Sequence, residues 1–262
     1  MAQSDDPRAL RDPRYAVLHA LPDEIRYFRG LEHLRIGREG MDARVESRRG
    51  DASQGAIHGC SVCIGVGVGN AFQNTSLLLQ SVPSLRALIV IGFAGALSDS
   101  VGAGDVVVGE SVTNLASRQS YEAPSGLLAA MDAHARAQKS HRGRIVTADR
   151  VIVTAAEKQQ LGRATGALAV DMESAGVAAA AAEHGVPWIA VRVISDGVND
   201  DLPLDFNALA NADGSVNTRR IIASVLLRPA KIPALIRLGM RTSAAARNLA
   251  AFLQPLLQRL PE

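Results

Sequence analysis

The sequence predicts an α/β domain, in which a buried β-sheet is covered by helices on both faces. Short apolar runs alternate along the chain with longer segments of helical character. The runs are apolar on both strand faces, as at Trp188–Ile194, which is typical of a sheet buried from both sides. No repeat or linker divides the 262 residues, so we expect one domain at 1–214, with a helical extension of the same domain at 215–262.

The predicted strands are short apolar runs that end at Pro, Gly or a polar residue. The polar, Gly-rich segment 36–55 is instead expected to be a loop with an edge strand. In chain order, the predicted strands and short extended segments are Tyr15–Leu21, Ser61–Val68, Arg86–Phe93, Asp105–Val112, Arg144–Thr147, Val151–Val153, Ala167–Val170 and Trp188–Ile194.

The predicted helices carry start and stop signals. Asp23 and Glu24 suit the positive N-terminal end of a helix dipole, and Pro83 ends a helix over 70–81. Residues 113–140 are expected to mix loop and helix. The remaining predicted helices are Ala155–Leu161, Met172–His184 before Gly185 and Pro187, and a C-terminal region interrupted by Pro229, Pro233 and Pro255.

Charge is distributed unevenly along the chain. The net charge is +2, but the segment from Ser215 to Glu262 alone carries +7, so the body is mildly acidic. Apolar residues recur between the arginines of this segment at helical spacing. They predict either a helix packed on the body with a solvated basic face, or peripheral membrane contact through residues 219–260. Aromatic residues make up only 3% of the chain, which argues against nucleic-acid binding.

The two cysteines, Cys60 and Cys63, are three residues apart in a predicted strand. Their side chains are therefore expected on opposite faces, where they share neither a disulfide nor a metal. Free thiols suit a reducing compartment. The N-terminus has no apolar run typical of a signal peptide, and no stretch is long and apolar enough for a membrane span. We therefore expect a cytoplasmic protein without a metal site.

Polar residues occur near the carboxyl ends of four predicted strands, where open α/β sheets bind ligands. The glycine run Gly65–Gly69 is not a dinucleotide fingerprint, because Asn70 stands at the third glycine position and no acidic residue follows about 20 positions on. The four candidate segments are Asp23–Glu24, Phe93–Gly95, Asp171–Glu173 and Ser195–Asp196.

Two segments, IGFAGALSDSVGAGDVVVGE and VDMESAGVAAAAAEHGVPWIAVRVISDGVND, resemble the purine nucleoside phosphorylase and methylthioadenosine/adenosylhomocysteine nucleosidase superfamily. The resemblance runs in order from Tyr15 to Asp200. Through TADRVIVTAAEK and the basic C-terminus, the chain is most similar to the hopanoid-associated phosphorylases, which release adenine from adenosylhopane. The resemblance implies a phosphorylase/hydrolase-like fold around a mixed, partly barrelled sheet, a homo-oligomer (dimer or trimer), a purine nucleoside substrate and no cofactor.

The resemblance also implies roles for individual residues. Met172 and Glu173 match the pair that holds the ribose, and Ser195 and Asp196 match the pair whose aspartate faces N7 of the purine. Such an acid helps the base to leave, while carboxylates beside the sugar offset the charge of an oxocarbenium-like transition state. The other implied site residues are Arg192 and Glu24, which hold the attacking water with Glu173, and Ala94, Gly95, Val151 and Ile152, which line the purine.

The nucleophile is predicted from two positions at which this chain differs from the phosphate-using members of the superfamily. Phosphate-using members of the superfamily carry Ser where this chain has Phe93, and Arg where it has Val90. Their loss favours water over phosphate as the nucleophile, and Phe93 becomes a candidate wall for a 5′ substituent. Phosphorolysis and a non-catalytic nucleoside-binding protein remain alternatives. Structural explanations also stay open: Asp196 as a turn cap, Glu24 and Glu173 as helix-dipole partners, and Arg192 as a buried ion-pair partner.

Overall fold

The computed structural model describes residues 13–39, 42–48, 59–135, 140–205, 207 and 232–259. The strands are β1 (Tyr15–His19), β2 (Glu32–Glu39), β3 (Asp42–Arg48), β4 (Gly59–Cys63), β5 (Ala87–Ala96), β6 (Val106–Asn114), β7 (Ser120–Glu122), β8 (Ser140–Thr147), β9 (Ala169–Asp171) and β10 (Trp188–Asp196). The helices are α1 (Pro22–Ile25), α2 (Val68–Ser81), α3 (Ser125–Ala135), α4 (Ala155–Thr165), α5 (Ser174–His184) and α7 (Ile232–Leu257).

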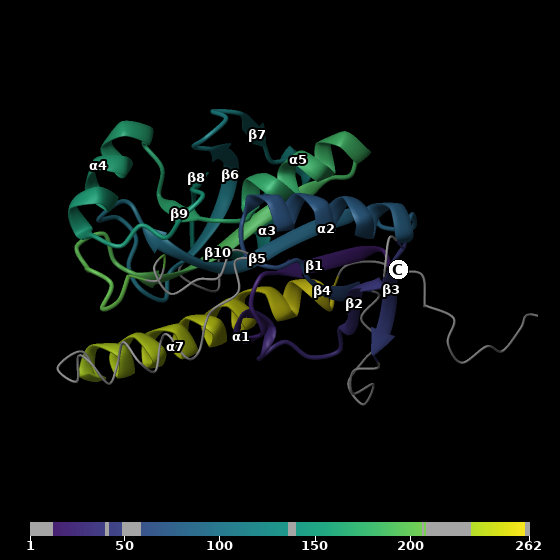
Figure 1. The fold of residues 1–262 in the computed structure, drawn as a ribbon, viewed down its shortest axis with the longest axis horizontal. Coiled ribbons are helices and arrows are strands. Elements are labelled where there is room, and N and C mark those ends of the chain that lie inside the picture. The colour runs from purple at the N-terminus through teal and green to yellow at the C-terminus, as the bar shows by residue number, and fades with distance from the viewer. Residues whose placement is uncertain are drawn as a thin grey trace, which may run out of the picture.

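The strands form one mixed sheet, part of which closes on itself. Around the closed part, β10 pairs with β6, β6 with β8, β8 with β9, β9 with β5, and β5 again with β10. From β5 the sheet continues through β1, β4 and β2 to β3, which forms an open wing. Figure 1 shows the closed part on the left and the wing on the right. The α/β class and the mixed, partly barrelled sheet predicted for this chain are thus confirmed.

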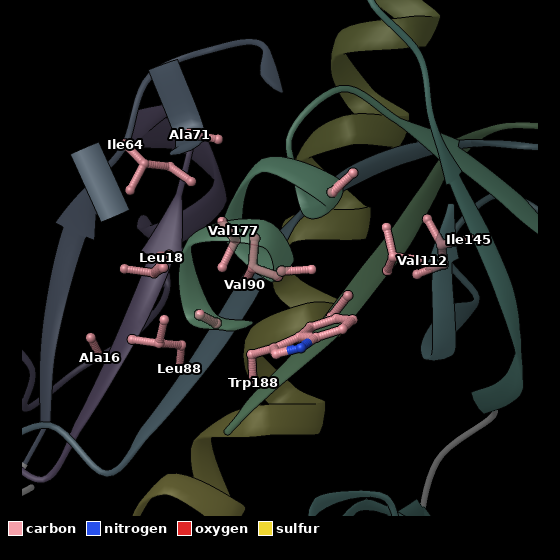
Figure 2. Packing of buried hydrophobic residues seen from close by; sticks show 14 of the residues in the cluster. Ala16, Leu18, Ile64, Ala71, Leu88, Val90, Val112, Ile145, Val177 and Trp188 are labelled. Atoms are coloured by element: carbon pink, nitrogen blue, oxygen red, sulfur yellow. The ribbon is translucent and has the colours of Figure 1, made fainter. Parts of the chain in front are cut away.

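Helices cover both faces of the sheet. One buried cluster joins β1, β4, β5 and β10 to α2 and α5, and Figure 2 shows Trp188, Val90 and Val177 among its members. A second buried cluster lies on the opposite face, where α1, α3 and α7 pack. Figure 1 shows α7 running along this second face. The strands are therefore apolar on both sides, as their sequences predict.

The long helix α7 is anchored to the body by its C-terminal half. Phe252 and Leu253 are fully buried, and the Tyr15 hydroxyl donates a hydrogen bond to the carbonyl of Leu257 (2.9 Å). The N-terminal half instead exposes Ile236 and Met240. No helix among the described residues is both long and apolar enough to cross a membrane.

Several local predictions need correction. Within 36–55 the predicted edge strand is present as β3, but residues 36–39 belong to β2 rather than to a loop, because β2 pairs antiparallel with β3. The strand predicted to end at Phe93 continues to Ala96, and the one predicted to end at Ile194 continues to Asp196, because β5 and β10 pair along this stretch. Pro255 does not interrupt α7, because it lies in the last turn, and the buried Leu256 and Leu257 hold that turn against the body. Pro229 and residues 215–231 lie outside the described residues.

Candidate active site

The turn between β1 and α1 aims the carboxylate of Glu24 back into the protein. Its Oε2 accepts hydrogen bonds from the amides of Ala20 (2.8 Å) and Leu21 (2.9 Å), and its Oε1 accepts one from the amide of Phe93 (3.1 Å). Pro22 at the start of α1 has no N–H to leave unpaired. Burial raises the pKa of Glu24, although Arg192 and the three amides oppose this shift. The carboxyl group of Glu24 is therefore fixed by hydrogen bonds and binds a proton more readily than an exposed glutamate does.

Arg192, on β10, is the centre of a buried charged network. Its Nη2 lies 2.7 Å from Oδ2 of Asp171 and 3.7 Å from Oε2 of Glu173. Its Nε and Nη2 also donate to the Ser174 hydroxyl (3.2 and 3.0 Å), and its Nη1 donates to the carbonyl of Ile91 (2.9 Å). Arg192 is fully buried, so its charge depends on these partners.

The side chain of Glu173 lies at the N-terminus of α5, on the same network. Its Oε1 accepts a hydrogen bond from the amide of Gly67 (3.1 Å), a residue whose φ of 93° suits glycine. Burial, together with the nearby Asp171 and Glu24, raises the pKa of Glu173 to about 7, although Arg192 and the Gly67 amide oppose this shift. Glu173 therefore changes its charge near neutral pH.

Gly92 allows Glu24 and Arg192 to meet over β5. A Cβ atom on Gly92 would lie 2.2 Å from Nη1 of Arg192 and 2.6 Å from Oε1 of Glu24. These contacts are shorter than any that a real Cβ makes, so a larger residue here would push the two charged groups apart. The structure thus brings together Glu24, Arg192 and Glu173, the three residues that the resemblance assigned to the attacking water.

Asp196 lies at the end of β10, four residues beyond Arg192. Its Oδ1 accepts a hydrogen bond from the Ser195 hydroxyl (2.6 Å), which also lies 3.2 Å from the carbonyl of Ala94. On the paired strand β5 this stretch corresponds to three residues, from Gly92 to Gly95, which span about 10 Å and accommodate a ribose with its purine. The sheet therefore presents a carboxylate cluster at one end of this span and a single carboxylate at the other.

Two charged residues of this region were not among the predicted site residues. Asp171 forms an ion pair with Arg192 and also accepts a hydrogen bond from the Thr147 hydroxyl (2.7 Å). Lys158, on α4, is fully buried and forms an ion pair with Asp196. Asp171 lay in a candidate segment at a strand end, and Lys158 lay in the TADRVIVTAAEK motif. Their partners, however, come from other elements, which no local signal identifies.

The remaining predicted residues occupy the surroundings of the carboxylates. Phe93 is half-buried, Ala94 is buried, and Gly95 pairs with Asp196 across β5 and β10. Met172 is half-buried between Asp171 and Glu173. The Asn207 side chain forms two hydrogen bonds with the backbone of Val151. It accepts one from the Val151 amide (2.8 Å) and donates one to the Val151 carbonyl (3.0 Å). Ile152 is buried in a small cluster with Leu97, Val146 and Val170.

A surface cavity of about 630 Å³ lies along α2, α5 and the β6–β7 region, and none of Glu24, Glu173, Arg192 and Asp196 lines it. Phe72, Tyr121 and Ala179 contribute to the apolar part of its wall. Among the described residues, no group of three or more His, Cys, Asp or Glu side chains could hold a metal ion. The residues assembled here can carry acid–base chemistry on a small molecule.

Comparison with known proteins shows the family to which this chain belongs. The family model described as the phosphorylase superfamily matches residues 14–227. The chain belongs to the phosphorylase superfamily. A 5′-methylthioadenosine/S-adenosylhomocysteine nucleosidase of Exiguobacterium is 28% identical over 183 residues, which cover 63% of this chain and 78% of the relative. A nucleosidase of the same name from Staphylococcus aureus is 27% identical over 162 residues, 55% of this chain and 71% of the relative.

Several solved structures share the fold. The nucleosidase of Neisseria meningitidis in complex with methylthio-immucillin-A superposes with a TM-score of 0.67 at 19% identity, covering 94% of this chain and 99% of the other. The futalosine hydrolase of Helicobacter pylori gives a TM-score of 0.67 at 17% identity, covering 95% and 99%. These likenesses show the fold. The family match and the nucleosidase relatives support an enzyme that acts on nucleosides.

Proposed function

We propose that this protein hydrolyses the N-glycosidic bond of a purine nucleoside and releases adenine. The observation that carries the proposal is the convergence of Glu24, Arg192 and Glu173 at one end of the β5–β10 pair, with Asp196 at the other end. The similarity to methylthioadenosine/adenosylhomocysteine nucleosidases supports the same reaction type. In this proposal the ribose lies against Met172 and Glu173, and the base lies toward Ser195 and Asp196, beside Ala94, Gly95, Val151 and Ile152.

The reaction requires charge at both ends of the nucleoside. As the C1′–N9 bond breaks, its electron pair passes into the purine, which leaves readily only when N7 receives a proton or a hydrogen bond. The sugar becomes oxocarbenium-like, and the carboxylate of Glu173 offsets its positive charge. Glu24, with its raised pKa, accepts a proton from the water that attacks C1′ from the opposite face. The stereochemistry at C1′ is therefore inverted.

Water is favoured over phosphate as the nucleophile. Val90 is fully buried in the core, and the Phe93 amide, which could otherwise bind an anion, donates to Glu24. A phosphate dianion beside the carboxylates of Glu24 and Glu173 would meet like charges, which oppose its binding. Phosphorolysis remains the alternative reaction, and it would require an anion site elsewhere on the sheet edge.

For the substrate itself, we propose an adenine nucleoside with an apolar 5′ substituent, such as adenosylhopane, used in hopanoid biosynthesis. Support comes from the half-buried Phe93, the candidate wall for a 5′ substituent, which lies beside Glu24 through its backbone amide. Methylthioadenosine and adenosylhomocysteine are the alternative substrates. The described part of 219–260 adds the exposed Ile236 and Met240, which would suit peripheral contact with the inner face of a membrane.

A cytoplasmic homo-oligomer, a dimer or trimer, completes the proposal. The free thiols of Cys60 and Cys63 suit a reducing compartment. Sedimentation analysis measures the oligomeric state, and flotation with anionic lipid vesicles measures membrane contact. Loss of flotation in an Ile236→Ser variant would assign that contact to α7.

Adenine release tests the proposed reaction. The substrates are adenosine, methylthioadenosine and a 5′-alkyl adenosine analogue, each assayed in phosphate-free buffer. We expect release without phosphate, and the highest kcat/KM for the 5′-alkyl analogue. Preference for methylthioadenosine would support the alternative substrate, and failure to release base from all three would contradict the proposed reaction.

A further inference from the structure

Lys158 is an uncommon residue because it is a lysine with no exposed surface. Its ammonium group donates to three acceptors: Oδ2 of Asp196, the carbonyl of Asp200 (2.9 Å) and the carbonyl of Gly197 (3.2 Å). A lysine ammonium has three N–H groups, so these partners use all of them. Burying a charge is costly unless its partners compensate, and these three acceptors compensate for the burial of the Lys158 ammonium.

Helix α4 is fixed in a way that aims Lys158 at Asp196. The side chain of Thr154 caps the helix by accepting from the amide of Glu157 (3.3 Å). The amide of Ala155 donates to Oδ1 of Asp201 (2.7 Å), and Gln159 donates to Oδ1 of Asn199 (2.7 Å). The first turns of α4 are therefore bound to the loop that follows β10, and this loop leads directly from Asp196.

The other side of Asp196 leaves room for this ion pair. A Cβ atom on Gly95 would lie 3.3 Å from Oδ2 of Asp196 and 3.8 Å from Cε of Lys158. Gly95 thus keeps the strand surface open where the two side chains meet. With Oδ1 held by Ser195 and Oδ2 held by Lys158, the carboxylate of Asp196 has one orientation.

We propose that Lys158 is a positioning residue that holds Asp196 toward the purine and supplies the proton that Asp196 delivers to N7. This inference rests on the proposed function and extends it to the origin of that proton. As the C1′–N9 bond breaks and its electrons enter the purine, Asp196 gives a proton to N7 and takes one from the Lys158 ammonium. The attacking water gives its proton to Glu24, and exchange with solvent then returns a proton to Lys158, so that protons balance over one turnover.

The competing explanation is structural, because Lys158 also ties the loop at Gly197 and Asp200. The variant Lys158→Gln separates the two explanations, since its amide still donates to these carbonyls but carries no charge. We expect kcat for adenine release to fall about 10²-fold, the usual contribution of proton transfer to a leaving group, with KM changed less than threefold. Gln159→Ala is the matched control, because it loosens the same loop without removing a charge, and we expect it to retain wild-type kcat.

Two further measurements give results that a purely structural role of Lys158 would not produce. In an Asp196→Asn background, adding Lys158→Met should cost no further rate, because Lys158 acts only through Asp196. The second measurement is the ratio of Lys158→Gln kcat to wild-type kcat, which should rise at least tenfold from pH 8 to pH 5. At low pH, solvent supplies Asp196 with the proton that Lys158 no longer provides. Where this proton supply limits the rate, kcat of the variant should rise about tenfold for each unit that the pH falls.

Three results would overturn the inference: Lys158→Gln with kcat within threefold of wild type, the same loss from Lys158→Met with and without Asp196, or a kcat ratio that does not change with pH. If the wild-type enzyme releases no adenine, the proposed function itself fails. If the wild type is active and the variants behave in any of these three ways, only the role of Lys158 fails.

Discussion

At the scale of single residues, the proposed reaction depends on carboxyl groups held in fixed positions. The buried carboxylate of Glu24 accepts hydrogen bonds from three backbone amides, whereas the side chain of its neighbour Asp23 is 77% exposed. These adjacent acidic residues therefore differ sharply in environment. Only Glu24 is placed to accept a proton from water beside Arg192 and Glu173.

Replacement of Glu24 by Gln tests this role. We predict that kcat falls roughly 10²- to 10⁴-fold, because the amide keeps the size of the side chain but cannot take a proton. Asp23→Asn, on the same helix, should leave kcat and KM unchanged. Steady-state kinetics with both variants makes the comparison. Equal, small effects at the two positions would remove Glu24 from the mechanism.

The pH dependence of the reaction follows from Glu173. Burial and the nearby carboxylates raise its pKa to about 7, so it is an anion above that pH and takes up a proton below it. The anion is the form that offsets positive charge on the sugar, so kcat/KM should fall as the pH drops through about 7. In Glu173→Gln, kcat/KM should be low at all pH values without this step. A wild-type profile that stays flat between pH 8 and 5 would contradict the assignment.

The sequence predicted part of this site. Glu24, Glu173, Ser195 and Asp196 were recognisable because polar residues at strand ends form the binding edge of an α/β sheet. Lys158 was not, because a lysine within a polar helix is typical of a solvated surface. Its burial arises only when α4 folds against the loop after β10, and this contact is set by tertiary packing.

At the scale of helices and strands, α2 and α5 approach each other closely. A Cβ atom on Gly176 of α5 would lie 2.3 Å from the carbonyl oxygen of Val68 in α2. The N-termini of these two helices flank the contact between Gly67 and Glu173. The separation of α2 and α5 therefore controls the position of a site residue.

Gly176→Ala tests this close approach. We predict a loss of about 1–3 kcal/mol in the free energy of unfolding, because the added methyl group forces the two helices apart. Gly69→Ala, in α2, is the matched control, since a Cβ there would meet nothing within 4 Å. It should leave stability unchanged or raise it, because alanine favours the helix. Urea unfolding measures both, and equal stability of the two variants would contradict the predicted packing.

Element boundaries were predicted less well than element types. The strands β5 and β10 extend past their predicted ends because they pair with each other as far as Gly95 and Asp196. The sequence around these residues is polar and Gly-rich, which locally favours a turn. Pairing between segments about 100 residues apart supplies the hydrogen bonds that keep it extended, and no local pattern contains that information.

At the scale of the whole molecule, two features lie beyond local prediction. One is the closure of β10, β6, β8, β9 and β5 into a ring, which requires contacts between distant segments. The other is the division of α7 into an anchored half and an exposed half. Helical spacing predicted the helix itself, whereas the body decides which of its apolar residues are buried.

Paired substitutions in α7 test this division. Phe252 is fully buried, and we predict that Phe252→Ala lowers the free energy of unfolding by about 3–5 kcal/mol. Ile236 is 58% exposed, and Ile236→Ala should change stability by less than about 0.5 kcal/mol. Chemical denaturation of both variants gives the two values. Similar values would show that α7 is not anchored as described.

The identity of the sugar product distinguishes hydrolysis from phosphorolysis. The purified enzyme would be incubated with the 5′-alkyl adenosine analogue in the presence of excess phosphate, and the products separated by mass. We predict adenine together with the free sugar, because Glu24 delivers water to C1′ and leaves no place for phosphate. A sugar 1-phosphate as the product would contradict hydrolysis and identify the enzyme as a phosphorylase.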